Sequence, residues 1–165
     1  MVVEEIKIIE VGMGEFKISS SPHILVTRGL GSCLGITIYD YAKKIGSLAH
    51  PMLPDIDKAK INSNPTRFVN SVIEKMVDEL RLRGCSVNSL VAKIFGGAHM
   101  FTNVSGNSIF NVGTKNIEKA KESLNNLKIR ISAEDVGGNF GRTIEFYLET
   151  GRVKVKTVFY GEKEL

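Results

Sequence analysis

The chain has 165 residues, 42% of them hydrophobic, and carries a formal net charge of +4 at pH 7. This length and apolar content predict a single domain, residues 1–165, whose core needs no covalent cross-links. Two cysteines are too few for a disulfide framework, and the basic residues are interleaved with acidic ones, which argues against nucleic-acid binding. The basic excess instead favours acidic protein partners.

The sequence contains no recognisable targeting or membrane segment. No stretch approaches the roughly 20 consecutive apolar residues of a membrane helix. The N-terminal sequence MVVEEIKIIEVG is acidic, and its apolar run is too short for a signal peptide. We therefore expect a cytoplasmic protein with no membrane insertion.

Short strands are predicted in the first third of the chain. Residues 5–18 have the pattern of a hairpin that is interrupted at the glycine-containing turn 12–14. The strands predicted next are residues 24–27, 34–39 and 45–50. The last of these ends at Pro51, and the alternation of apolar and polar residues is clearest in 34–39.

Two helices are predicted in the middle of the chain. In SNPTRFVNSVIEKMVDELRLRG, Asn64 suits the N-cap, Pro65 the first helical position and Gly84 the helix exit. Apolar residues at helical spacing form one face, namely Phe68, Val69, Val72, Ile73, Met76, Val77 and Leu80. The second helix is expected at about 114–127, with the apolar stripe Ile117, Ala120, Leu124 and Leu127.

The remaining segments predict strands at 90–95, 128–133, 143–149 and 152–160. Thr150 and Gly151 are expected to form the tight turn between the last two strands. Strands outnumber helices, and several strands that are neighbours in sequence are expected to pair antiparallel. The predicted fold is therefore a layered α/β sandwich of mixed β-sheet, with both helices packed on sheet.

Cys33 lies in a glycine-rich turn between two predicted strands, in the stretch LVTRGLGSCLGITIYD (residues 25–40). The glycines at 29, 31 and 35 permit backbone angles and close approaches that other residues forbid. Successive amide groups in such a turn can converge on one point, as a developing oxyanion requires. The alternative is a buried structural cysteine, the usual role of a free thiol. Cys85, which follows a helix exit, receives that structural interpretation.

A cysteine nucleophile needs a base, because only about 3% of an unperturbed thiol is ionised at pH 7. Cys33 begins one predicted strand and His50 ends the next, so antiparallel pairing of these strands places the two residues side by side. This geometry favours His50 over His99, the competitor in FGGAHMF, and over His23, which precedes a strand.

A paired imidazole can take the thiol proton and hold the resulting ions together. We therefore expect Cys33 to be ionised well below its ordinary pKa of about 8.5. A catalytic imidazole usually has a third group that fixes its tautomer. The hydroxyl of Thr27, at the end of the preceding strand, is one candidate for this group. The alternative is that Thr27 is only an ordinary strand residue, since threonine is favoured in β-strands.

Four segments together resemble the CheD family, the chemoreceptor glutamine deamidases of bacterial and archaeal chemotaxis. The segments are VTRGLGSCLGITIYD, GSLAHPMLP, AKIFGGAHMF and DVGGNFGRTIEFYLETGRV, in the family's order from about residue 11 to 158. The resemblance implies a Cys–His–Thr triad with Cys33 as nucleophile, His50 as base and Thr27 as the orienting hydroxyl. It also implies a fold similar to that of cysteine deamidase toxins that act on small GTPases.

The resemblance further implies a hydrolase that converts glutamines on the cytoplasmic helices of methyl-accepting chemotaxis proteins to glutamates. The reaction would pass through a Cys33 thioester, with the oxyanion bound by amides of the turn near Gly31 and Ser32, and without a metal or organic cofactor. Some relatives also hydrolyse glutamyl methyl esters. Relatives further bind a CheC-type phosphatase, so the alternative function is a regulatory module that docks on such a phosphatase and stimulates it.

Three weaker interpretations complete the prediction. A thiol protease fits the order of cysteine before histidine, but 165 residues leave little room for an extended peptide cleft. A redox thiol lacks a C-x-x-C motif. The loop DVGGNFGR (residues 135–142) has the glycines and arginine of an anion site, but a structural loop between closely approaching strands is the preferred interpretation.

Overall fold

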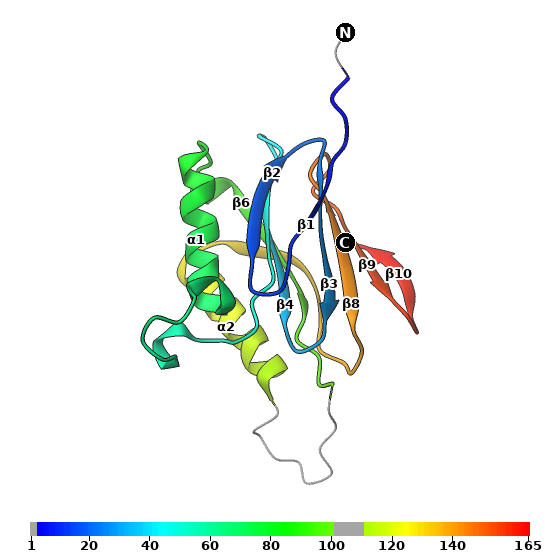
Figure 1. Ribbon diagram of the computed structural model, residues 1–165. Helices are drawn as coiled ribbons and strands as arrows, with labels where there is room; N and C mark the ends of the chain where they lie inside the picture. Colours follow the sequence, from blue (N-terminus) through cyan, green and yellow to red (C-terminus); the bar gives the residue numbers. More distant parts are fainter. Residues whose placement is uncertain (1–2, 101–110) are drawn as a thin grey trace.

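The computed structural model describes residues 3–100 and 111–165, which form two sheets of five strands and two α-helices (Figure 1). One sheet has the strand order β1-β3-β8-β9-β10, and the other has the order β2-β5-β4-β6-β7. Helices α1 (Val69–Leu82) and α2 (Val112–Asn126) pack side by side on the second sheet, as Figure 1 shows. The predicted α/β sandwich with helices packed on sheet is therefore confirmed.

The strands of the first sheet are β1 (Ile8–Glu10), β3 (Ile24–Leu30), β8 (Arg142–Tyr147), β9 (Val153–Thr157) and β10 (Gly161–Glu164). Those of the second sheet are β2 (Phe16–Ser20), β5 (Ile45–Ala49), β4 (Leu34–Asp40), β6 (Leu90–Gly96) and β7 (Arg130–Val136). The pairs β1–β3 and β6–β7 are parallel, and the other paired strands are antiparallel.

Two hydrophobic clusters hold the three layers together. The cluster between the sheets includes Leu25, Phe95, Ile144 and Phe146, all fully buried. The cluster between the second sheet and the helices takes up the apolar faces of α1 and α2. Full burial of each such side chain contributes about 1.5–3 kcal/mol. The strands that carry the candidate site are thus anchored in the core on both sides of the second sheet.

The apolar face predicted for α1 is buried along its whole length, but the helix begins later than expected. Pro65–Arg67 forms a short 3₁₀ turn capped by Asn64, and Phe68 is extended before α1 starts at Val69. Phe68 forms a bridge with Leu53, and the Val69 amide donates to Leu53 O (2.8 Å). This contact with the preceding loop interrupts the helix that the sequence pattern had suggested.

The hairpin predicted for residues 5–18 is wrong. β1 pairs in parallel with β3 in the first sheet, whereas β2 pairs with β5 in the second sheet. The turn 12–14 therefore carries the chain from one sheet to the other instead of joining two paired strands. The prediction failed because the partners of both strands lie further along the chain.

The single strand predicted for 152–160 is also wrong. β9 ends at Thr157, a turn follows, and β10 pairs back on β9. The turn exposes three large side chains, Val158, Phe159 and Tyr160, which had extended the apolar pattern of the strand. A turn joins the antiparallel strands β8 and β9 as predicted, but it is wider than Thr150 and Gly151, because β8 ends at Tyr147 and β9 begins at Val153.

Neither α1 nor α2, the α-helices found in residues 3–100 and 111–165, has the length and apolar character needed to cross a membrane.

Candidate active site

Cys33 lies half-buried in the turn 31–33, which joins β3 to β4 at the lower end of the molecule in Figure 1. Each carbonyl of this turn accepts a hydrogen bond. The donors are the Ala98 amide to Gly31 O (2.8 Å), Asn116 Nδ2 to Ser32 O (2.9 Å) and the Gly97 amide to Cys33 O (3.0 Å). Within the described residues, the amides of the turn donate to no other residue. The turn therefore has its carbonyls fixed, and its amides are not used by any other described residue.

Glycine is required where the end of β6 meets this turn. Gly96 has a φ of +94°, and a Cβ atom at this position would overlap the carbonyl oxygen of Cys33. Gly35, two residues after Cys33, is also closely approached, because a Cβ there would lie 2.6 Å from the Ile144 side chain of the other sheet. These two glycines let strands pack tightly around the turn that holds Cys33.

His50 follows β5 and is almost completely buried. The antiparallel pairing predicted between the strand after Cys33 and the strand before His50 is confirmed. The pairing continues past β5, since the Leu34 amide donates to Pro51 O (3.1 Å). Leu34 follows Cys33 and Pro51 follows His50, so the two candidate residues occupy neighbouring positions at one end of the β4–β5 pair.

Thr27, in β3, is fully buried and contacts His50 directly. Its Oγ1 lies 2.7 Å from His50 Nδ1 and 2.7 Å from the carbonyl oxygen of Val11. A carbonyl only accepts, so the single hydroxyl proton of Thr27 is donated to Val11 O. The Thr27 oxygen must then accept from His50 Nδ1–H. This arrangement places the proton of the neutral imidazole on Nδ1 and leaves the lone pair on Nε2.

The lone pair of His50 Nε2 has no partner among the described residues. Nε2 is buried and makes no hydrogen bond within the part of the chain that the structure describes. A buried nitrogen without a partner is costly in a folded protein, and such exceptions are concentrated at functional sites. Thr27, His50 and the turn of Cys33 thus form a compact group whose proton acceptor, His50 Nε2, is not used by any residue in 3–100 or 111–165.

The expected thiolate–imidazolium pair is not found. Burial raises the pKa of the Cys33 thiol, although the backbone amide of Cys33 acts in the opposite direction. Burial also lowers the pKa of the His50 imidazole. Both effects favour the neutral forms, because neither group has a hydrogen-bonded partner of opposite charge that offsets desolvation. The direction of the thiol pKa is therefore opposite to the depression that the sequence analysis expected.

His99 is the other histidine close to the Cys33 turn. Its neighbour Ala98 donates to Gly31 O, and its own Nε2 lies 2.8 Å from Thr114 Oγ1. His99 is only half-buried, and the hydroxyl proton of Thr114 is not donated to a carbonyl among the described residues. The tautomer of His99 is therefore not fixed by its threonine in the way that Thr27 fixes the tautomer of His50. His23 lies elsewhere, with Nδ1 accepting from the Lys7 amide.

Comparison with known proteins adds an independent line of evidence. Residues 52–157 match the family model described as CheD chemotactic sensory transduction. The chain belongs to the CheD family. A probable chemoreceptor glutamine deamidase CheD of Caldanaerobacter subterraneus is 46% identical over 159 residues, covering 96% of this chain and 98% of the relative. A Methanosarcina acetivorans relative with the name probable chemoreceptor glutamine deamidase CheD 1 is 47% identical, covering 94% and 96%. The chemoreceptor glutamine deamidase CheD of Halalkalibacterium halodurans is 42% identical, covering 96% and 98%.

The family-model match begins at residue 52, after Thr27, Cys33 and His50. It spans β6 and α2, and the Gly97 amide after β6 and Asn116 of α2 hydrogen-bond to the turn of Cys33. The candidate residues of this CheD-family chain therefore rest on their own geometry, while the near full-length similarity to the relatives covers the segment in which they lie.

The loop DVGGNFGR of this CheD-family protein is held by its own ion pairs. Asp135 accepts from Arg142 Nε (3.1 Å) and pairs with Lys163 Nζ (2.9 Å). The Arg142 guanidinium is buried and also donates to Gly137 O (2.9 Å). These contacts occupy the Arg142 guanidinium, which an anion-binding site in this loop would require. They therefore agree with the preferred interpretation of a structural loop. Cys85 is likewise buried in the core between the second sheet and the helices.

Sequence reasoning missed one residue of this site in the CheD-family chain. Asn116, on α2, is fully buried, and its Nδ2 donates to the carbonyls of Ser32 (2.9 Å) and Met52 (3.1 Å). An asparagine inside a helix has no cap or turn role, and it interrupts the apolar face at that position. This mismatch between a polar side chain and a buried helical position is the signal that could have identified it.

Proposed function

We propose that this protein is a chemoreceptor glutamine deamidase in which Cys33 is the nucleophile, His50 the general base and Thr27 the residue that orients His50. The substrate is a glutamine side chain on a receptor's cytoplasmic helix. The single observation that carries this assignment is the Thr27 hydroxyl, whose bond to Val11 O leaves His50 Nε2 as a proton acceptor that no described residue uses. Membership of the CheD family supplies the reaction class.

The first half of the reaction forms a thioester. His50 Nε2 accepts the proton of the Cys33 thiol as Sγ bonds to the carboxamide carbon, so the attacking thiolate exists only during the attack. Amides of the turn, including those of Gly31 and Ser32, donate to the oxyanion. The imidazolium then gives its proton to the departing nitrogen, the C–N bond breaks, and ammonia leaves.

The second half hydrolyses the thioester. His50, neutral again, accepts a proton from water as the water oxygen bonds to the thioester carbon. The C–S bond breaks, the sulfur recovers a proton from the imidazolium, and glutamate is released. The chain of Val11 O, Thr27 Oγ1 and His50 Nδ1 keeps the ring oriented through both proton transfers.

The direct test is mass spectrometry of a receptor cytoplasmic helix after incubation with the protein. We expect particular glutamines to gain the mass that accompanies replacement of the amide nitrogen by oxygen, with release of one ammonia per site. A receptor helix that stays unchanged under conditions in which the protein is folded would contradict the proposal.

We predict that Cys33 of the free protein alkylates like an ordinary or less acidic thiol. Because burial raises its pKa, the rate of iodoacetamide alkylation should rise with a midpoint at or above about pH 8.5. His50→Ala should leave this midpoint nearly unchanged, since no ion pair is lost. The rate at Cys33 is read by mass spectrometry over a pH series. A midpoint far below 8.5 that moves up in His50→Ala would instead establish a resting thiolate–imidazolium pair.

A further inference from the structure

Cys33 and His50 lie in two different segments of the chain, and the side chain of Asn116 links these two segments. Cys33 lies in the turn 31–33, and His50 begins the loop that leads to α1. The side-chain amide of Asn116 spans these segments, donating one hydrogen to Ser32 O and the other to Met52 O. Its orientation is not ambiguous, because both partners are carbonyls and only the NH₂ end can donate.

Stability alone does not account for an asparagine at this position. Asn116 is fully buried on a helix face that otherwise packs into the core, and its Oδ1 has no hydrogen-bond partner among the described residues. A buried amide oxygen without a partner destabilises the folded state. The two donated hydrogen bonds are the compensating feature, and they end one residue before Cys33 and two residues after His50.

We infer that Asn116 is a positioning residue that fixes the distance between the Cys33 turn and the His50 loop. This inference rests on the proposed function. Proton transfer from Sγ to Nε2 requires the two atoms to come within hydrogen-bond reach, and small displacements of such groups lower rates strongly. Asn116 acts through the backbone of Ser32 and Met52 and touches neither the substrate nor the reacting atoms.

The test compares Asn116→Ala with Leu124→Ala, a matched control. Leu124 is fully buried on the same helix, so its truncation weakens the packing of α2 without touching either segment. At a temperature where circular dichroism shows each variant folded, we expect Asn116→Ala to lower kcat by about 10-fold or more with little change in KM. Leu124→Ala should keep its kcat.

Should Asn116→Ala not fold, Asn116→Asp is judged by the same criterion, since it keeps the side-chain volume and loses both donors. Equal kcat values for an Asn116 variant and Leu124→Ala would overturn the positioning role. If the wild-type protein does not deamidate a receptor helix at all, the proposed function is contradicted instead.

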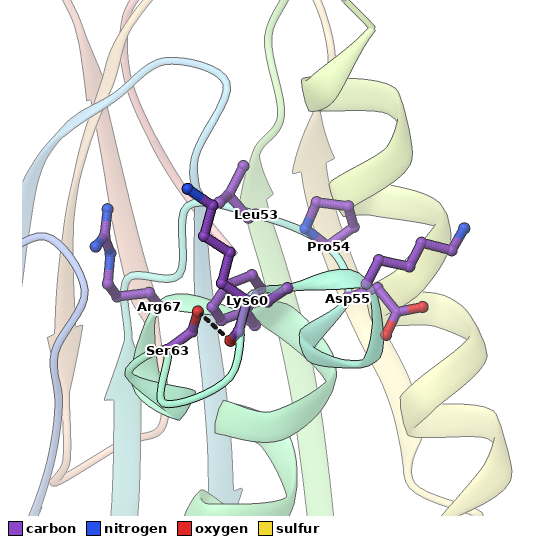
Figure 2. Close-up of a pocket in the computed structure, with 9 residues that line it drawn as sticks. Leu53, Pro54, Asp55, Lys60, Ser63 and Arg67 are labelled. Carbon is purple, nitrogen blue, oxygen red and sulfur yellow. Dashed lines mark hydrogen bonds between the residues drawn. The ribbon is translucent and has the colours of Figure 1, made fainter.

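A pocket beside the same loop supports a second inference from different observations. The loop between β5 and α1 encloses a cavity of about 430 Å³. Its lining is Leu53, Pro54, Asp55, Lys58, Ala59, Lys60, Ser63, Arg67 and Phe68, most of which Figure 2 shows around the loop. Arg67 O accepts from the amides of Met52 (2.8 Å) and Leu53 (3.1 Å), so the pocket begins two to three residues after His50.

The pocket has an apolar base and unpaired positive charge. Lys58, Lys60 and Arg67 are exposed, and none forms a salt bridge with a described residue. Figure 2 shows Lys60 and Arg67 extending toward the same side as Leu53. The one carboxylate in the lining, Asp55, is already occupied by Lys119 (3.4 Å), Asn70 and the Asp57 amide.

The pocket is adjacent to the backbone of His50. The aliphatic stem of Arg67 lies against Gly14, where a Cβ would come within 3.1 Å of it. The Gly14 amide in turn donates to His50 O (2.8 Å). Arg67 of the pocket and the carbonyl of His50 are thus both neighbours of Gly14.

We propose that this pocket binds glutamate side chains of the receptor segment that flanks the substrate glutamine. This proposal also rests on the proposed function, because deamidation itself converts glutamines of that segment to carboxylates. Three cations without a salt bridge to any described residue favour a segment that has already gained such carboxylates. Modification of one glutamine would then promote binding for modification of its neighbour.

The test uses two synthetic helical peptides that differ only in whether the residues flanking the target glutamine are glutamine or glutamate. We expect the wild-type KM to be about 5-fold or more lower for the glutamate peptide, and the difference to shrink with added salt. In the double variant Lys58→Glu/Lys60→Glu, the difference in KM between the two peptides should disappear, and kcat should stay unchanged. The control Lys7→Glu/Lys75→Glu changes the net charge equally at exposed lysines elsewhere.

Equal KM values for the two peptides in the wild-type protein, or a difference that persists in the pocket variant, would overturn the pocket proposal. The absence of ammonia release from both peptides would contradict the deamidase proposal. The pocket proposal would then still be tested by fluorescence anisotropy with Cys33→Ala protein, which measures whether the glutamate peptide binds more tightly than the glutamine peptide.

Discussion

Replacing Cys33 with alanine is expected to abolish deamidation and to leave the fold intact. The sulfur is the nucleophile that attacks the carboxamide in the proposed reaction, and alanine has no atom that can form the acyl intermediate. The turn itself should persist, because its recorded hydrogen bonds use main-chain carbonyls that alanine retains. Activity is measured by mass spectrometry of a receptor helix, and folding by circular dichroism.

Cys85→Ala is the matched control for this prediction. Cys85 is a buried core residue whose thiol pKa is raised, first by burial and then by the nearby Asp40 carboxylate. It should therefore be unreactive, and its replacement should leave activity per folded molecule near normal. Activity that survives in Cys33→Ala and is lost in Cys85→Ala would reverse the assignment of the nucleophile.

The same Cys33 variant separates catalysis from docking. The predicted partnership with a CheC-type phosphatase does not require the thiol. If Cys33→Ala retains binding to such a phosphatase and still stimulates it, the regulatory module is a function of its own beside deamidation.

Local patterns in the sequence were sufficient to predict most of the secondary structure and the adjacency of two site residues. The strands that flank Cys33 and precede His50 are neighbours along the chain, so their antiparallel pairing could be inferred directly. The hairpin predicted at residues 5–18 failed for the opposite reason, since β1 and β2 find partners in different sheets. Pairing between distant segments leaves little trace in a single sequence.

The ionisation state of the site depends on burial, which the sequence does not specify. Motif order alone suggested an ion pair between Cys33 and His50. In the folded protein both groups are desolvated, and this effect favours the neutral forms. The role of Asn116 was hidden for a similar reason, because its partners are backbone carbonyls of two loops far away in sequence.

Replacing His50 with alanine is expected to lower kcat on the order of 10²- to 10⁴-fold, the usual contribution of a positioned acid–base group. The loss should exceed that of any substitution in this site except Cys33→Ala. Because burial raises the pKa of the Cys33 thiol, the attack depends on a group that takes the proton at that moment, and His50 Nε2 is an acceptor without a hydrogen bond to any described residue. The rate is measured by ammonia release from a receptor helix, on protein shown to be folded.

His99→Ala is the control, since His99 also lies near the Cys33 turn and contacts a threonine. We expect it to retain most of its activity once the fraction of folded protein is taken into account. A fully active His50→Ala protein, together with an inactive His99→Ala protein, would transfer the role of base to His99.

The pH dependence of kcat provides a second measure of the same assignment. The base must be neutral to accept the thiol proton, so activity is lost as the pH falls through the pKa of His50. Burial lowers that pKa, and the loss should therefore occur below about pH 6.5, the ordinary value for histidine. The residual activity of His50→Ala should lack this acidic decline, because no base titrates in that range. An acidic decline that is identical in the variant and in the wild-type protein would show that another group carries the proton.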